Sequence, residues 1–188
     1  MLSSVIRACH RLVMGVAGPF LIAASAILLF NGFSSSGEEL LPPPPAGSDF
    51  SCGIAEVLDG DTVDLRCPDG RVRLRLYGID APERSQSPWG QGATEHLQSL
   101  LRGPEFDIRV VDTDIYNRAV GIILDEGVDV GLRMVVDGWA SVRTRYVRDV
   151  DYREARSNAR RHALGIWSEP GLQQRPWEWR RVNPRNQG

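Results

Sequence analysis

The segment from Arg71 to Leu76 alternates strictly between arginine and aliphatic residues. This period of two predicts a half-buried β-strand, with Val72, Leu74 and Leu76 facing a core. Two short β-prone runs, 54–58 and 63–66, precede it and are joined through an Asp-Gly-Asp sequence that is typical of a hairpin turn. This part of the chain is therefore expected to form consecutive strands.

The elements that follow mix helical and extended patterns. Apolar residues at helical spacing predict a helix after Pro88-Trp89-Gly90, and Arg102-Gly103-Pro104 ends it. Two more strands are expected at 106–110 and 119–124, and two helices follow. Five strands with a helix after the third are what a small closed barrel of the OB type requires. A generic α+β sandwich agrees with the same order and remains open at this point.

Two acidic motifs, DGDT and IDAPE, flank the alternating strand. Ala81 precedes a proline and is biased toward an extended conformation, so Asp80 and Glu83 are expected on a rigid segment outside any helix. Carboxylate and backbone oxygens are the ligands that hard cations such as Ca²⁺ prefer. Asp61 and Asp80 could therefore hold a divalent cation, and Glu83 is the candidate for activating water. With 3 histidines in the chain, one of them near the N-terminus, a histidine base or a zinc site has little support.

Two arginines near these motifs are candidates for binding a phosphate, whose oxygens a guanidinium can contact in pairs. Arg75 and Asp80 are spaced so that they would lie on opposite faces of an unbroken strand, but Gly78 offers a bulge that could bring them together. Arg118 follows a turn-like DIYN sequence and leads into the next apolar strand. The alternative for either arginine is a solvated strand face.

Taken together, these motifs resemble the staphylococcal nuclease (thermonuclease) family. The resemblance rests on DGDT, RLYGIDAPE, DIYNR, DGWA and the AR-x-x-ALGIW segment, and it covers about residues 52–169 with order and spacing kept. It implies a mainly β, α+β fold: a five-stranded OB-fold barrel with three helices. It also implies a Ca²⁺-dependent phosphodiesterase that acts on DNA and RNA. We expect the protein to be a monomer.

The resemblance implies specific roles for the acidic residues. Asp61 and Asp80 would ligate Ca²⁺, and Ala81 would offer its backbone carbonyl as a further ligand. Glu83 would be the general base or the group that orients the attacking water. The loop at 84–90 looks shorter than in the staphylococcal enzyme, which leaves substrate affinity open.

The resemblance also implies how the substrate would be held. Arg75 and Arg118 would bind the phosphate and stabilise the charge that develops on it in the transition state. Tyr116 and Tyr146 would contact the substrate. Thr144 falls where the staphylococcal enzyme has a base-stacking tyrosine, so base preference is open as well.

The N-terminus carries a membrane signal. An apolar run of 19 residues, 12–30, follows Arg7 and Arg11. As a helix it would span about 28 Å, close to the hydrocarbon thickness of a bilayer. The basic flank predicts that the rest of the chain is exported. We expect either an uncleaved signal anchor, with the domain on the periplasmic or extracellular side, or a signal peptide that is cleaved after Ala26 so that the protein is secreted.

These features predict four parts of the chain: a signal segment at 1–30, a proline- and serine-rich linker at 31–49, an OB-fold domain at 50–170 and a basic tail at 171–188. In the tail, arginines are interleaved with Trp177 and Trp179. Such a tail could stack on and neutralise single-stranded nucleic acid. A packed or disordered tail is the alternative.

Cys52 and Cys67 are expected to form a disulfide. In an antiparallel hairpin without a bulge, the position numbers of opposing residues have a constant sum. If Leu58 pairs with Thr62 this sum is 120, and for the two cysteines it is 119. A one-residue bulge at the turn would make the cysteines cross-strand neighbours, within the distance that a disulfide accepts. Export would place them in an oxidising compartment, while Cys9 stays in the leader. Two unpaired buried cysteines are the alternative.

The charge distribution bears on the partners. Residues 48–140 carry 9 arginines against 17 acidic residues, whereas residues 141–188 carry 11 against 5. A polyanion would therefore be held mainly by the C-terminal part, and the acidic part could attract cations. Two other functions stay open: a catalytically silent OB-fold module that binds a polyanion, and an accessory protein in envelope or exopolysaccharide production.

Overall fold

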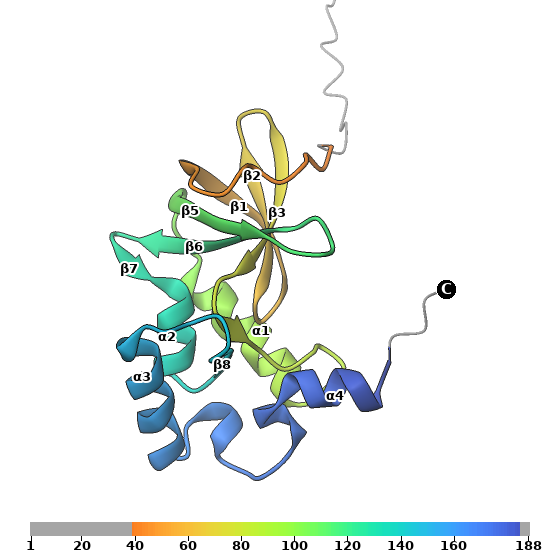
Figure 1. Cartoon of the computed structure of the whole chain (residues 1–188), viewed down its shortest axis with the longest axis vertical. Coiled ribbons are helices and arrows are strands. Elements are labelled where there is room, and N and C mark those ends of the chain that lie inside the picture. Colours follow the sequence, from red (N-terminus) through yellow and green to blue (C-terminus); the bar gives the residue numbers. More distant parts are fainter. Residues whose placement is uncertain (1–38, 185–188) are drawn as a thin grey trace, which may run out of the picture. The chain divides into compact units, whose positions relative to one another are not determined.

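Five strands form a closed β-barrel in the computed structural model, which describes residues 39–184 (Figure 1). They are β1 (Asp49–Asp59), β2 (Thr62–Cys67), β3 (Gly70–Leu76), β5 (Phe106–Thr113) and β6 (Ala119–Asp125). Neighbouring strands pair in the order β3-β2-β1-β5-β6, and a parallel pairing between β3 and β6 closes the ring. The predicted five-stranded barrel is confirmed, and the structure decides against the generic α+β sandwich.

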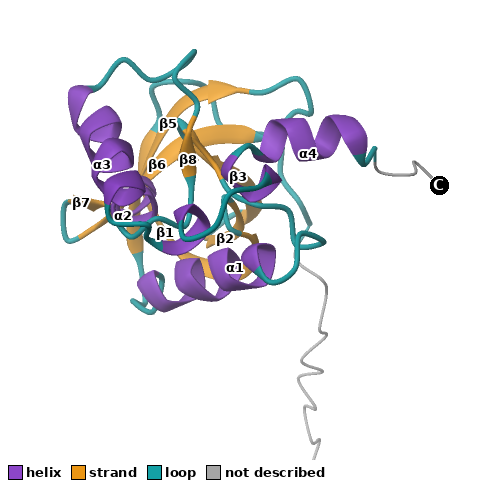
Figure 2. Ribbon diagram, turned by 90° about the horizontal axis from the view of Figure 1, so that it is seen from below, coloured by secondary structure: helices purple, strands orange, loops and turns teal. Residues whose placement is uncertain are grey.

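Four α-helices occur within residues 39–184, one more than the sequence predicts. They are α1 (Trp89–Leu100), α2 (Val130–Val136), α3 (Val150–Arg161) and α4 (Pro176–Val182). The additional helix, α4, lies in the stretch expected as a basic tail, and two short 3₁₀ turns, Gly165–Trp167 and Leu172–Gln174, lead into it. Helices α2 and α3 pack side by side, and α4 lies apart from them (Figure 2).

Three short strands complete the architecture. Strand β7 (Val128–Asp129) extends the sheet beyond β6. Strand β4 (Ile79–Asp80) pairs with β8 (Ser141–Val142) in a separate two-stranded sheet, in which Asp80 lies opposite Ser141. This small sheet joins the end of β3 to the segment between α2 and α3, so it fixes the conformation of the chain around Asp80.

The alternating strand packs as its sequence predicts. Val72, Leu74 and Leu76 are 4%, 0% and 1% exposed and face the barrel core, and α1 covers one end of that core with Ala93 and Leu97. Full burial of an aliphatic side chain stabilises a fold by about 1.5–3 kcal/mol. The core therefore holds β3 firmly, and with it the arginines on the other face of the strand.

The described chain meets the barrel before β1 begins. Leu40 forms an isolated bridge with Arg71, and the Leu41 N–H donates to the Arg71 carbonyl at 2.7 Å. The apolar run at 12–30 lies outside the described residues. Within 39–184, no helix is long and apolar enough to span a bilayer.

Cys52 and Cys67 form the predicted disulfide, with their Cα atoms 4.9 Å apart. The route to this pairing differs slightly from the expectation. The hairpin pairs Asp59 with Thr62, and two irregularities in β1 then shift the register, where the sequence suggested one. The bridge joins the β1–β2 hairpin at the end opposite to its turn.

Candidate active site

The β1–β2 turn comes very close to the segment that follows β4. A Cβ atom on Gly60 would lie 2.6 Å from the Cβ of Ala81 and 2.7 Å from that of Ala93, so only glycine fits there. This approach lets the Asp61 Oδ2 accept a hydrogen bond from the Ala81 N–H at 3.0 Å. The two acidic motifs, which lie 20 residues apart along the chain at this contact, therefore meet in one place.

Arg75 joins the two aspartates of these motifs. Its Nη1 lies 2.7 Å from the Asp61 Oδ1, and its Nη2 lies 2.9 Å from the Asp80 Oδ1. The chain turns at Gly78, which has a φ of +75°, and this turn brings Arg75 and Asp80 together as the sequence suggested. Asp61 is 3% exposed and Asp80 is 0% exposed. The site is thus a buried cluster of carboxylates around one guanidinium group.

The environment shifts the pKa values of these carboxyls. Burial raises the pKa of Asp80, and the charge of Asp61 raises it further, against the lowering effect of the Arg180 and Arg75 guanidinium groups. Burial acts on Asp61 too, but Arg75 and the Ala81 N–H outweigh it and lower the pKa of Asp61. Burial and the charge of Asp61 raise the pKa of Asp59 to about 7. The cluster therefore favours the ionised form of Asp61 and disfavours the ionised forms of Asp59 and Asp80.

The donor set suits the cation that the resemblance implies. Asp61 and Asp80 supply carboxylate oxygens, the ligands that Ca²⁺ prefers. No group of three His, Cys, Asp or Glu side chains within residues 39–184 forms a metal-binding arrangement. A bound Ca²⁺ would take carboxylate oxygens from Asp61 and Asp80, and its other ligands from backbone carbonyls, water and phosphate. Ala81 is the residue expected to offer its backbone carbonyl as a ligand. Its N–H donates a hydrogen bond to Asp61, which holds this peptide beside the cluster.

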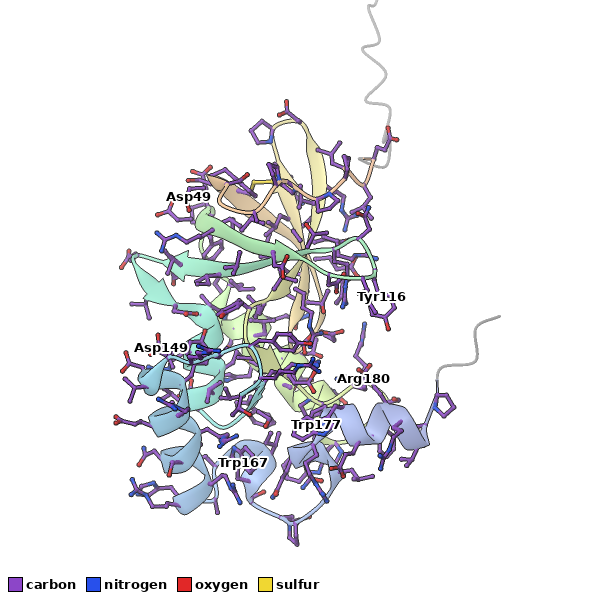
Figure 3. The ribbon with its side chains drawn as sticks, viewed as in Figure 1. Asp49, Tyr116, Asp149, Trp167, Trp177 and Arg180 are labelled. Carbon is purple, nitrogen blue, oxygen red and sulfur yellow. A yellow bond between two sulfur atoms is a disulfide. The ribbon has the colours of Figure 1, made fainter. Side chains whose placement is uncertain are left out.

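Arg180, from α4, completes the cluster. Its Nη2 lies 2.8 Å and 2.9 Å from the two carboxylate oxygens of Asp80, and its Nη1 lies 2.7 Å from the Glu83 Oε1 (Figure 3). Sequence reasoning missed this role. The only signal was the arginine and tryptophan content of the tail, because a contact between residues 100 positions apart leaves no local pattern.

A tight turn positions Glu83 ahead of α1. The Glu83 N–H donates to the Gln86 Oε1 at 2.9 Å, and the Gln86 N–H donates to the Glu83 carbonyl at 2.7 Å. A side chain at Gly90 would collide with that carbonyl, so the helix starts directly against the turn. The Glu83 side chain is 13% exposed and points to Arg180. The proposed base is therefore held in place from both its backbone and its carboxylate.

Arg118 is placed differently from Arg75. Its Nε and Nη2 donate to the Asp114 Oδ2 at 2.8 Å and 2.6 Å, and within the described chain Asp114 is its hydrogen-bonding partner. Burial would raise the pKa of Asp114, but these bonds outweigh it and lower that pKa. The guanidinium also lies 5.4 Å from the ring of Tyr116, which is 72% exposed. The structure thus keeps Arg118 with Tyr116 and does not pair it with Asp80 or Glu83.

Tyr146 follows β8 along the chain. Its ring is 54% exposed and lies 5.2 Å from the guanidinium of Arg143, whose Nη1 is 3.9 Å from the Asp80 Oδ1. The Tyr77 hydroxyl donates to the Tyr146 carbonyl at 2.8 Å and holds this segment. An exposed ring beside a cation near the cluster is suitable for contact with a nucleotide.

Comparison with known proteins identifies the family. Residues 73–169 match the family described as staphylococcal nuclease homologue. A micrococcal nuclease from Shigella flexneri is 32% identical over 149 residues, which cover 73% of this chain and 84% of the relative. The chain belongs to the staphylococcal nuclease family. At the level of the family, its function is that of a nuclease, as the motifs predicted.

Other nuclease relatives agree. An uncharacterized endonuclease from Escherichia coli O157:H7 is 34% identical over 68% of this chain and 82% of its own length. A probable staphylococcal-like nuclease from rice is 38% identical over 59% of this chain, but over only 33% of its own length. The matched nuclease region at 73–169 includes Arg75, Asp80, Glu83 and Arg118, whereas Asp61 and Arg180 lie outside it. The structure is what places these last two residues with the others.

Proposed function

We propose that this chain is a Ca²⁺-dependent nuclease that hydrolyses phosphodiester bonds of DNA and RNA. The observation that carries the proposal is the buried acidic cluster. In it, Arg75 lies 2.7 Å from Asp61 and 2.9 Å from Asp80, and Arg180 joins this cluster to Glu83. Membership of a nuclease family supports the reaction class.

Each side chain has a defined task in this proposal. Asp61 and Asp80 would hold the cation, with the Ala81 carbonyl as a further ligand. When bound, Ca²⁺ supplies positive charge that neutralises the phosphate and stabilises the transition state. Glu83 would take a proton from the attacking water, which can reach its partly exposed carboxylate. Arg75 and Arg118 bind the phosphate oxygens and stabilise the charge that builds up on them.

Three arginines must change or share partners for this reaction. Arg75 must exchange at least one of its two aspartates for the phosphate. Arg180 occupies the carboxylates of Asp80 and Glu83, so it must release at least Asp80 when the cation binds. Arg118 must exchange Asp114 for the phosphate. These ion pairs favour, as a second candidate, a module that binds a polyanion without cleaving it. The following experiment separates the two functions.

Glu83→Gln in the full-length chain should reduce the cleavage of single-stranded DNA and RNA by at least the ~10²-fold expected for a lost general base. Binding of the same strands should change little, because the amide keeps the shape of the side chain. Glu95→Gln is the matched control, since Glu95 is exposed on α1 and, among residues 39–184, its carboxylate accepts a hydrogen bond from Gln91 alone, at 2.7 Å. Cleavage should also stop when a chelator is added. Equal rates for wild type and Glu83→Gln would exclude the mechanism, and binding without any Ca²⁺-dependent cleavage would select the silent module.

We also propose that the domain works outside the cytoplasm, tethered by the apolar run at 12–30 or released after cleavage. The Cys52–Cys67 disulfide supports export, because such bonds persist in oxidising compartments. Full-length protein that stays in membranes after carbonate extraction would support the tether. A mature N-terminus just after Ala26 would instead show release.

A further inference from the structure

A cavity of about 260 Å³ lies between the turn that holds Glu83 and the C-terminal part of the chain. Two tryptophans, Trp89 and Trp179, contribute to its walls together with the amides of Gln86 and Gln173. We propose that this cavity, termed here the tryptophan pocket, binds one unpaired nucleobase of the substrate. The proposal rests on the proposed nuclease function and adds the substrate class: nucleic acid with an unstacked base beside the scissile phosphate.

The tryptophan pocket is joined to the acidic cluster through both of its walls. On one wall, the Gln86 Oε1 accepts the hydrogen bond of the Glu83 N–H. On the other, Trp179 directly precedes Arg180, whose guanidinium binds Asp80 and Glu83 at 2.7–2.9 Å. A base in the pocket would therefore belong to a nucleotide next to the phosphate that the cluster holds.

Both amides present an unused polar atom although their residues are buried. Gln86 is 5% exposed, and because its Oε1 accepts from a backbone N–H, its Nε2 is the end that remains. Gln173 is 7% exposed, and its Nε2 donates to the Glu169 carbonyl at 2.6 Å, so its Oε1 remains. Neither atom has a hydrogen-bonding partner within residues 39–184, and neither is sealed from solvent. Two residues of the pocket lining thus leave one donor, on Gln86, and one acceptor, on Gln173 beside Gly171, for a ligand.

A nucleobase matches these features. Aromatic side chains are the usual platforms for unpaired bases, and every base edge carries both donors and acceptors that an amide can meet. The volume is slightly below the ~300–1,000 Å³ of pockets for drug-sized ligands, which suits a single base. A paired base is stacked in its duplex and could not enter. The tryptophan pocket therefore favours single-stranded substrate and tolerates different bases.

The test compares two tryptophans of α4 in the full-length chain. Trp179 lines the pocket, whereas Trp177 is 42% exposed and does not, so Trp177→Ala is the matched control for Trp179→Ala. With chelator present, anisotropy of a labelled single-stranded oligonucleotide should show binding weakened about 5- to 150-fold by Trp179→Ala, because one base stack contributes ~1–3 kcal/mol. Trp177→Ala should stay within about twofold of wild type on the same grounds.

Three further measurements make the outcome decisive. Trp179→Phe, which keeps an aromatic ring, should restore most of the binding. This result would assign the loss in Trp179→Ala to the missing ring. An oligonucleotide with abasic sites should bind wild type and Trp179→Ala equally. With Ca²⁺, Trp179→Ala should raise KM more than it lowers kcat. Equal binding by wild type and Trp179→Ala, or equal losses in both alanine variants, would overturn the pocket. A selective binding loss in a protein that never cleaves would keep the pocket and reject the proposed function.

Discussion

Strand β3 supplies arginines to two buried acidic clusters that differ in charge balance. In the first, termed here the Asp64 cluster, one carboxylate that is 3% exposed binds Arg71 and Arg73 at 2.8 Å each. The second is the acidic cluster of the candidate active site, where Arg75 faces both Asp61 and Asp80. Arg71 and Arg73 therefore share one buried acid, with the exposed Glu56 3.5 Å from Arg71, whereas Arg75 alone meets two buried acids.

The difference separates a structural use of buried charge from a functional one. The Asp64 cluster satisfies its carboxylate with residues of the same hairpin. The acidic cluster has too few arginines nearby and takes Arg180 from a helix 100 residues away from Asp80. A buried ion pair contributes little net stability unless its groups are fully compensated. A surplus of buried carboxylates is costly to the fold and suits a cation, which supports the second cluster as the proposed reactive site.

The largest expected effect on stability comes from removing the disulfide near the Asp64 cluster. Cys52→Ser with Cys67→Ser should lower the free energy of unfolding by about 3 kcal/mol, because the bridge closes a loop of 15 residues. Urea denaturation measures this loss. At urea concentrations below the midpoint of unfolding of the variant, the cleavage rate should stay close to that of wild type, since the bridge lies far from the hairpin turn. A large loss of cleavage with little loss of stability would contradict the division between the two clusters.

The second prediction compares the same substitution in each cluster. Without divalent cation, Asp64→Asn should lower the free energy of unfolding by about 1.5–3 kcal/mol, which is the contribution of hydrogen bonds to charged groups. Asp80→Asn should lower it by less. Burial and the charge of Asp61 raise the pKa of Asp80 in the fold, so the fold favours the protonated carboxyl. Stability therefore falls as pH rises from the unfolded pKa of Asp80 through its folded pKa. A neutral amide at this position avoids that loss.

Cleavage should rank these two variants in the opposite order. Asp80→Asn removes a proposed Ca²⁺ ligand and should lose nearly all activity, while Asp64→Asn should keep most of it. Urea denaturation and a cleavage assay on the same samples give both rankings. If both variants lost stability and activity in parallel, the two clusters would not differ in kind.

The smallest expected effect concerns Arg180 and the cation. If the guanidinium competes with Ca²⁺ for Asp80, Arg180→Gln should bind Ca²⁺ up to about tenfold more tightly, which adds about 1.4 kcal/mol of Ca²⁺-dependent stabilisation. Thermal unfolding with and without Ca²⁺ measures the difference as a larger rise in Tm. Arg181→Gln is the control, because Arg181 is exposed on the same helix. An unchanged Ca²⁺-dependent rise in Arg180→Gln would show that Arg180 and the cation do not compete.

The barrel could be predicted from the sequence because its signals are local. The alternation at 71–76 fixes which side of β3 faces the core, and the Asp-Gly-Asp turn sets the hairpin that brings Cys52 close to Cys67. Each of these depends on residues that are near one another along the chain. The motif resemblance likewise predicted that Asp61 and Asp80 would meet.

Charge partners could not be predicted in the same way. Asp114 holds Arg118, Asp64 holds Arg73, and Arg180 covers Glu83, but an acidic or basic residue on an exposed pattern gives no sign of its partner. The helix α4 was missed because its seven residues are too few for a periodic signal and begin with a proline, which occurs as often in a loop. Only the fold shows that this segment reaches the acidic cluster.

The distance along the chain between Asp80 and Arg180 also bears on the order of events during folding. Residues 49–125 contain all five barrel strands, so β3 can pair with β6 before α4 docks. The contact between Arg180 and Asp80, which joins positions 100 residues apart, forms only when α4 docks on the folded barrel. A newly made molecule therefore passes through a stage in which the barrel is complete and its acidic cluster is open to the surrounding ions.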